Sequence, residues 1–138
     1  MLVKEIMSTN IASLKSDDTI EKAAMLMKQY DVGSSPVCNQ NNIVGIVTDR
    51  DITLRCVAVG QDTKHQRVCD IMTENPVVGS PDMNVSDAVR IMSDKQIRRL
   101  PIVDNNSLVG IVALGDISLE PTQQDNAETA LKNISMPD

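Results

Sequence analysis

Apolar residues follow two different periods along the first half of the chain. Positions 20, 23, 24 and 27 hold Ile, Ala, Ala and Met, the spacing of one face of an α-helix. Asp17, Asp18 and Thr19 precede them and are typical helix-capping residues. Two apolar runs follow, one starting near Pro36 and one over 43–47, separated by polar residues at 39–42. This pattern predicts a helix and then two strands joined by a tight turn.

Shorter elements surround this helix and hairpin. We expect a helical turn near 4–7, a short strand near 11–14, and a helix that begins at 48–51 and ends at Gly60. The order of elements is then β-α-β-β-α.

The whole pattern returns after a shift of 65 positions. Pro36 falls on Pro101, the run Val-Gly-Ile-Val at 44–47 falls on the same four residues at 109–112, and Asp51 falls on Asp116. A repeat of this kind indicates one structural unit used twice. We predict repeat 1 at 3–60, a connector at 61–67, repeat 2 at 68–119, and a tail at 120–138 with a short helix over 126–134.

The predicted fold class is α/β (α+β), with the two repeats packed by pseudo-two-fold symmetry. The last strand of each repeat is a continuous apolar run, which is typical of a strand covered on both faces. One repeat covers only one face of its own sheet, so we expect the other repeat to cover the second face. Two equivalent clefts would then lie between the repeats.

Composition narrows the range of functions. The chain has 138 residues, a net charge of −6 and a single aromatic residue, Tyr30. An acidic chain without stacking rings is unsuited to binding nucleic acid. No apolar run approaches a membrane span, and the N-terminus lacks an export signal, so we expect a cytoplasmic protein with no membrane partner.

Histidines and cysteines, which often act in catalysis or bind metals, are few and scattered in this sequence. His65 is the one histidine, and it has no partner carboxylate at a helpful spacing. The three cysteines, at 38, 56 and 69, form no close pair; we expect buried thiols, with neither a disulfide nor a metal site. The methionines at 25, 27, 72 and 92 are expected to fill the core in place of aromatic rings. We therefore predict that the protein is not an enzyme and needs no cofactor.

The paired motifs resemble a known family. An Ile-Met pair, a proline-led strand and Val-Gly-Ile-Val-Thr-Asp-Arg-Asp at 44–51 are similar to tandem cystathionine-β-synthase (CBS) domains, the Bateman module, in its stand-alone bacterial form. The resemblance covers residues 3 to 117. It implies a regulatory, signalling module that binds an adenosine-containing ligand (AMP, ADP, ATP or S-adenosylmethionine) in its clefts and forms a homodimer. Its protein partner is unknown.

The resemblance assigns contacts to the ribose of that ligand. Thr48 and Asp51 are the residues that hold ribose hydroxyls in the family, and Asp116 is the second copy of Asp51. The same two residues at 48 and 51 also fit a helix capping box. In the second repeat Ala113 replaces the hydroxyl residue, so we expect no capping box there and a weaker second site.

Basic and aliphatic residues complete the expected site. The resemblance implies phosphate contacts for Arg98 and Arg99, whereas the alternative is a solvated strand start paired with Asp94 or Asp104. Because neighbouring strand residues point to opposite faces, we expect only one arginine to face a cleft. The expected surroundings of the adenine are Val32, Ser35, Pro36, Ile97 and Pro101.

Two functions of different kinds remain open at this point. One is the sensor of an adenosine-containing ligand. The other is a module for dimerisation or protein interaction, in which the clefts are vestigial.

Overall fold

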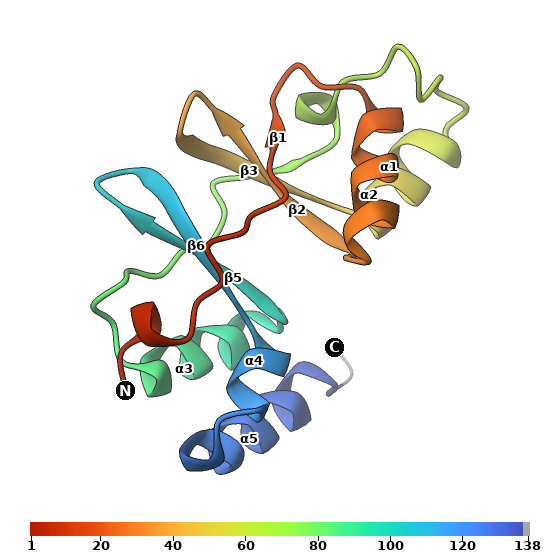
Figure 1. Ribbon diagram of the computed structural model, residues 1–138. Coiled ribbons are helices and arrows are strands. Elements are labelled where there is room, and N and C mark those ends of the chain that lie inside the picture. Colours follow the sequence, from red (N-terminus) through yellow and green to blue (C-terminus); the bar gives the residue numbers. More distant parts are fainter. Residues whose placement is uncertain (137–138) are drawn as a thin grey trace. The chain divides into compact units, whose positions relative to one another are not determined.

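The chain forms two compact units, each built from helices and a small sheet (Figure 1). The computed structural model describes residues 1–136. One unit, here the first-repeat unit, contains Ala12–Pro76, and the other, the second-repeat unit, combines Met1–Ile11 with the chain from Val77 onwards. The α+β class predicted from the sequence is confirmed.

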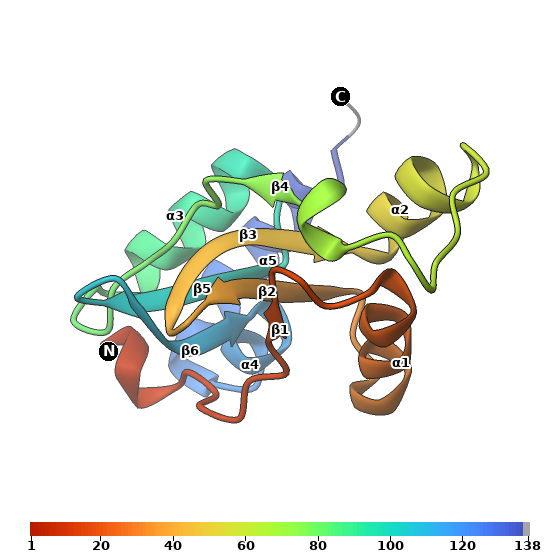
Figure 2. The ribbon, with the colours of Figure 1, turned by 90° about the horizontal axis from the view of Figure 1, so that it is seen from above.

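The first-repeat unit contains the strands β1 to β4. Its elements are β1 (Leu14–Lys15), α1 (Ile20–Tyr30), β2 (Ser34–Asn39), β3 (Asn42–Thr48), α2 (Asp49–Ile52), a π-helical turn (Thr53–Val57), a 3₁₀ turn (Val68–Asp70) and β4 (Thr73–Glu74). Strand β2 runs parallel to β1 and antiparallel to β3, and β4 is antiparallel to β3. Figure 2 shows α1 and α2 together at one end of β2 and β3.

The second-repeat unit has the corresponding elements and one helix more. They are a 3₁₀ turn (Val3–Glu5), α3 (Val85–Lys95), β5 (Arg99–Asp104), β6 (Ser107–Ala113), α4 (Leu114–Ser118), a 3₁₀ turn (Pro121–Gln123) and α5 (Gln124–Ile134). Strands β5 and β6 are antiparallel. In place of β1, this unit has a single β-bridge between Gly79 and Ile102. In place of β4, it has a single β-bridge between Ser8 and Ile111.

The leading segment of each repeat packs in the unit of the other repeat. Met7, which precedes the first repeat's helix, lies against Gly110 of β6. Met72, its copy 65 residues later, lies against Gly45 of β3, where a Cβ would also come within 2.9 Å of a backbone oxygen. The glycine of each Val-Gly-Ile-Val motif therefore makes room for a methionine side chain. The boundaries of the folded units therefore differ from those of the sequence repeats, because each leading segment packs in the unit of the other repeat.

Local chemistry explains the ends of the helices and the turns. The Thr19 hydroxyl accepts a hydrogen bond from the Lys22 amide at 3.1 Å and caps α1, as its position predicts. Asp31 caps the C-terminus of α1 and Gln96 that of α3, and both residues are in the left-handed region with φ of 53°. Gly60 ends the helical segment that starts at α2, with φ of 77°.

Several expectations about buried side chains need correction. Met27 and Met92 lie in the two cores, but Met25 is exposed because it faces away from the buried stripe of α1. Cys38 and Cys56 are buried, and burial raises the pKa of the Cys38 thiol, whereas Cys69 is exposed.

The connector histidine also has a partner that the sequence reading missed. His65 Nδ1 lies 2.6 Å from the Asp62 carboxylate. The pKa of Asp62 is lowered by the Lys64 backbone N–H, which donates to it, and by His65. A turn at 62–65 brings the two side chains together, and both remain exposed.

Helix α5 begins at Gln124, two residues before the predicted helix, and packs against α3 and α4 (Figure 1). Its small residues Ala127 and Ala130 are buried there. The Gln96 side chain, at the end of α3, donates to the backbone oxygens of Asn133 and Met136 at 3.2 and 3.1 Å. The tail is thus part of the second-repeat unit, and residues 137 and 138 of the predicted tail lie outside the described residues.

Candidate functional site

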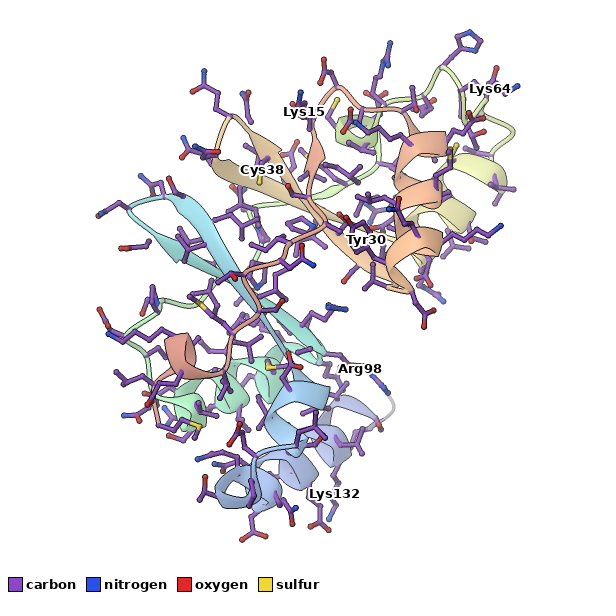
Figure 3. The ribbon with its side chains drawn as sticks, in the orientation of Figure 1. Lys15, Tyr30, Cys38, Lys64, Arg98 and Lys132 are labelled. Atoms are coloured by element: carbon purple, nitrogen blue, oxygen red, sulfur yellow. The ribbon has the colours of Figure 1, made fainter. Side chains whose placement is uncertain are left out.

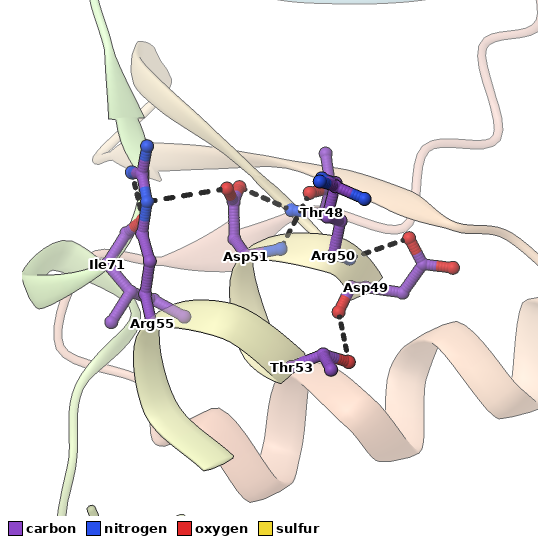
Figure 4. Close-up of polar contacts among 7 residues, drawn as sticks. All are labelled: Thr48, Asp49, Arg50, Asp51, Thr53, Arg55 and Ile71. Carbon is purple, nitrogen blue, oxygen red and sulfur yellow. Dashed lines mark hydrogen bonds and ion pairs between the residues drawn. The ribbon is translucent and has the colours of Figure 1, made fainter. Parts of the chain in front are cut away.

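The start of α2 carries a complete capping box (Figure 4). The Thr48 hydroxyl accepts from the Asp51 amide, and the Asp51 carboxylate accepts from the Thr48 amide, both at 3.0 Å. Strand β3 ends at Thr48, so the box fixes the turn from strand to helix. The capping interpretation of this motif is confirmed, and it orients the Asp51 side chain.

The second oxygen of Asp51 faces a cation. Arg55 Nε lies 3.8 Å from Asp51 Oδ1, and the same guanidinium donates to the Ile71 carbonyl at 3.0 Å (Figure 4). The Asp51 side chain is 13% exposed. A carboxylate has about four lone-pair sites, so these two contacts leave acceptor capacity for the hydroxyl groups of a ligand.

The equivalent turn in the second-repeat unit keeps half of this arrangement. Ala113 has no hydroxyl, but its amide donates to the Asp116 carboxylate at 3.4 Å. The expectation of no capping box holds for the missing hydroxyl, but it is wrong for Asp116, whose carboxylate supplies the other half of the box. Asp116 is half-buried, like Asp51.

Arg98 and Arg99 stand where β5 begins. The Arg98 carbonyl accepts from the Leu114 amide at 2.9 Å, and this places the arginine beside the start of α4. The first-repeat unit has the same bond, from the Asp49 amide to the Gly33 carbonyl, but a glycine in place of the arginine. Within residues 1–136 neither arginine forms an ion pair, so the pairing with Asp94 or Asp104 in the predicted alternative is wrong. Arg98 is exposed, as the solvated strand start of that alternative predicts.

Both arginines line one cavity of about 620 Å³ inside the second-repeat unit. This cavity is lined by residues of one unit alone, so the prediction that only one arginine faces a cleft between the repeats stays a prediction. Figure 3 labels Arg98 on the side of the unit where α5 lies. The cavity is lined by the two arginines, by 113–115 and Ser118 at α4, and by Gln124, Ala127, Glu128 and Leu131 of α5.

The α5 residues in this lining were absent from the sequence prediction. Nothing in the order of residues after 120 repeats a pattern of the first half, so only the docking of α5 shows that Glu128 lies beside the arginines' cavity.

The residues predicted to surround the adenine differ in accessibility. Val32 and Ile97 are half-buried, each just after the end of a helix. Ser35 is buried and its hydroxyl donates to the Ala12 carbonyl at 2.5 Å. The prolines at 36 and 101 are buried within β2 and β5. Val32 and Ile97 are thus the members of this set with accessible side-chain surface.

Across residues 1–136 no three His, Cys, Asp or Glu side chains are grouped as metal ligands would be. In the same part of the chain, no helix is both long and apolar enough to span a bilayer.

Comparisons with known proteins agree with the repeat. The family model described as "CBS domain" matches residues 3–57 and again 68–120. The CBS domain-containing protein YhcV of Bacillus subtilis is 47% identical over 133 residues, which are 96% of this chain and 94% of that protein.

Solved structures share the fold as well. A structure of Hypoxic Response Protein I with two coordinated zinc ions has a TM-score of 0.81 at 26% identity and covers 87% of this chain and 98% of its own. CBSX2 in complex with AMP has a TM-score of 0.75 at 27% identity and covers 90% of this chain and 98% of its own.

Proposed function

Because the chain belongs to the CBS-domain family and carries the domain twice, we propose that this regulatory module binds an adenosine-containing ligand without converting it. The ligand class is AMP, ADP, ATP or S-adenosylmethionine. The observation that carries the proposal is the pair of arginines on the cavity of the second-repeat unit, which have no ion-pair partner within residues 1–136. The AMP complex of CBSX2, a structure similar over 90% of this chain, supports the ligand class.

We assign the ribose contacts to Thr48 and Asp51 in the first-repeat unit and to Asp116 in the second. A carboxylate accepts hydrogen bonds from two neighbouring hydroxyl groups, which suits a ribose. The capping box holds the Asp51 side chain in one orientation before any ligand arrives, which lowers the entropic cost of binding.

We assign the phosphate contacts to Arg98 and Arg99. Their planar guanidinium groups can each bind two phosphate oxygens. In the first-repeat unit an adenine ring would lie near Val32, whose neighbours Ser35 and Pro36 are buried. In the second-repeat unit it would lie near Ile97, and Pro101 is buried there.

The role of Asp51 can be tested by calorimetric titration of AMP and ATP. We expect Asp51→Ala to weaken binding of both nucleotides at least about tenfold, because a charge-assisted hydrogen bond contributes about 1.5–3 kcal/mol. Asp51→Asn, which keeps a capping oxygen, separates lost binding from lost folding. Asp17→Ala removes an exposed carboxylate on the loop before α1 and serves as the control.

Equal affinities in the wild type and both Asp51 variants would remove Asp51 from the site. Circular dichroism of each variant shows whether the fold is kept.

A second candidate is a module for dimerisation or protein interaction whose nucleotide sites no longer bind. Two observations favour it: Ala113 lacks the hydroxyl of Thr48, and both Asp51 oxygens already have partners within the unit. A thermal-shift panel of adenine nucleotides and S-adenosylmethionine at millimolar concentration separates the two functions. A ligand that binds the folded state raises its melting temperature, so no shift with any compound would favour this second candidate.

We also propose that the chain forms a homodimer, as the family resemblance implies. Two apolar side chains on the helical side of the first-repeat unit, Leu54 and Val57, are 47% and 59% exposed. They support the proposal that a second copy of the chain contacts this side.

A further inference from the structure

The cavity of the second-repeat unit has walls of opposite charge. Arg98 and Arg99 lie on the side where β5 begins, and Glu128 lies on the side formed by α5. No ion pair joins Glu128 to either arginine within the described chain. The carboxylate and the guanidinium groups therefore face the same space without neutralising each other directly.

The remaining lining is mostly apolar or small. Besides the uncharged polar residues Ser118 and Gln124, it comprises Ala113, Leu114 and Gly115 around the start of α4, and Ala127 and Leu131 of α5. Since α5 is fixed by its packing on α3 and by the two hydrogen bonds from Gln96, the fold places the exposed Glu128 beside the cavity. It is not a carboxylate on a free tail.

The first-repeat unit shows what the site is like without such a helix. The hollow beside its α2 is smaller, about 320 Å³, and is lined by Asp49, Arg50, Thr53 and Leu54. Helix α5 thus adds a carboxylate, that of Glu128, to the larger cavity, whereas the acidic residue of the smaller hollow, Asp49, belongs to α2 itself.

We infer that Glu128 is a specificity-determining residue, which limits the phosphate charge that this cavity accepts. The inference rests on the proposed function. Each phosphate beyond the first brings more negative charge into the cavity that the Glu128 carboxylate also lines, and like charges there repel each other. The cavity then favours an adenosine monophosphate over the triphosphate, and the tail sets that preference.

The test compares AMP and ATP binding to the full chain and to Glu128→Gln, by calorimetry without divalent cations. ATP carries about two more negative charges than AMP near neutral pH. We expect the variant to bind AMP within about twofold of the wild type and ATP about tenfold more tightly. Asp125→Asn is the matched control, because it removes an exposed carboxylate from the same helix but does not line the cavity.

The outcomes separate this inference from the function on which it rests. An unchanged or reduced ATP-to-AMP affinity ratio in Glu128→Gln overturns the role of Glu128 while nucleotide binding stands. An equal gain in Asp125→Asn also overturns it, because net charge alone would then explain the effect. If neither nucleotide binds the wild type or Glu128→Gln, this inference fails, and AMP and ATP are removed from the ligands of the proposed function.

Discussion

At the scale of single residues, the two repeats differ most at the turn from strand to helix. Thr48 and Asp51 exchange two hydrogen bonds, while Ala113 and Asp116 share only one, and that one is longer. The hydroxyl at 48 is therefore a local source of stability that the second repeat lacks.

We expect Thr48→Ala to lower the free energy of unfolding by about 1 kcal/mol, the usual effect of losing a capping hydroxyl. Ala113→Thr should raise it by a smaller amount, because it supplies the missing half of the box in the other unit. Urea unfolding followed by circular dichroism measures both changes. No loss in Thr48→Ala would show that the capping bond contributes little to stability.

At the scale of elements, α5 distinguishes the two units. It buries Ala127 and Ala130 against α3 and α4, and it brings Glu128 to the cavity of the arginines. Small side chains allow this helix to approach its neighbours closely, and a larger or charged side chain there would prevent it.

We expect Ala130→Asp to cost at least about 2 kcal/mol of folding stability, because it buries a carboxylate without a partner. Thr129→Asp places the same side chain at the exposed neighbouring position of α5 and should change stability by less than about 0.5 kcal/mol. Urea unfolding of the two variants provides the comparison. Equal stability of both would mean that α5 is not docked in solution.

At the scale of the whole molecule, the exchanged leading segments tie the two repeats together along the chain. Residues 1–11 complete the unit of the second repeat, and residues up to Pro76 complete that of the first. Either repeat cut out at its sequence boundaries would lose the methionine that packs on its glycine, Met72 or Met7. Each folded unit therefore needs residues from both sequence repeats, although the two cores are separate.

The proposed homodimer is tested at this scale by sedimentation. We expect a species of twice the 15.0 kDa chain mass, and we expect Leu54→Glu to shift it toward the monomer. Leu119→Glu is the matched control, because Leu119 is the copy of Leu54 after the 65-residue shift and is 81% exposed in the unit where α5 packs. A monomeric wild type, or an equal effect of both variants, would contradict the proposed contact.

Much of the fold could be predicted because its signals are local. The helices α1 and α3 follow from apolar residues at helical spacing, and each hairpin follows from apolar runs around a polar turn. Asn105 and Asn106 adopt the left-handed conformations that their residue type favours, with φ of 50° and 69°. The repeat itself is visible in the sequence, and it carries the family assignment.

The sequence also predicts that the candidate site residues lie at the boundaries of elements. Thr48 and Asp51 lie where a helix begins after a strand, and Arg98 and Arg99 lie where a strand begins. What the sequence left undecided depends on contacts between distant segments. Only packing decides which unit receives each leading segment and where α5 docks. Only packing also shows that both arginines share a cavity with Glu128. Such contacts form between residues far apart in the chain, because their side chains fit together and are buried together. The periodicity of the sequence therefore does not predict them.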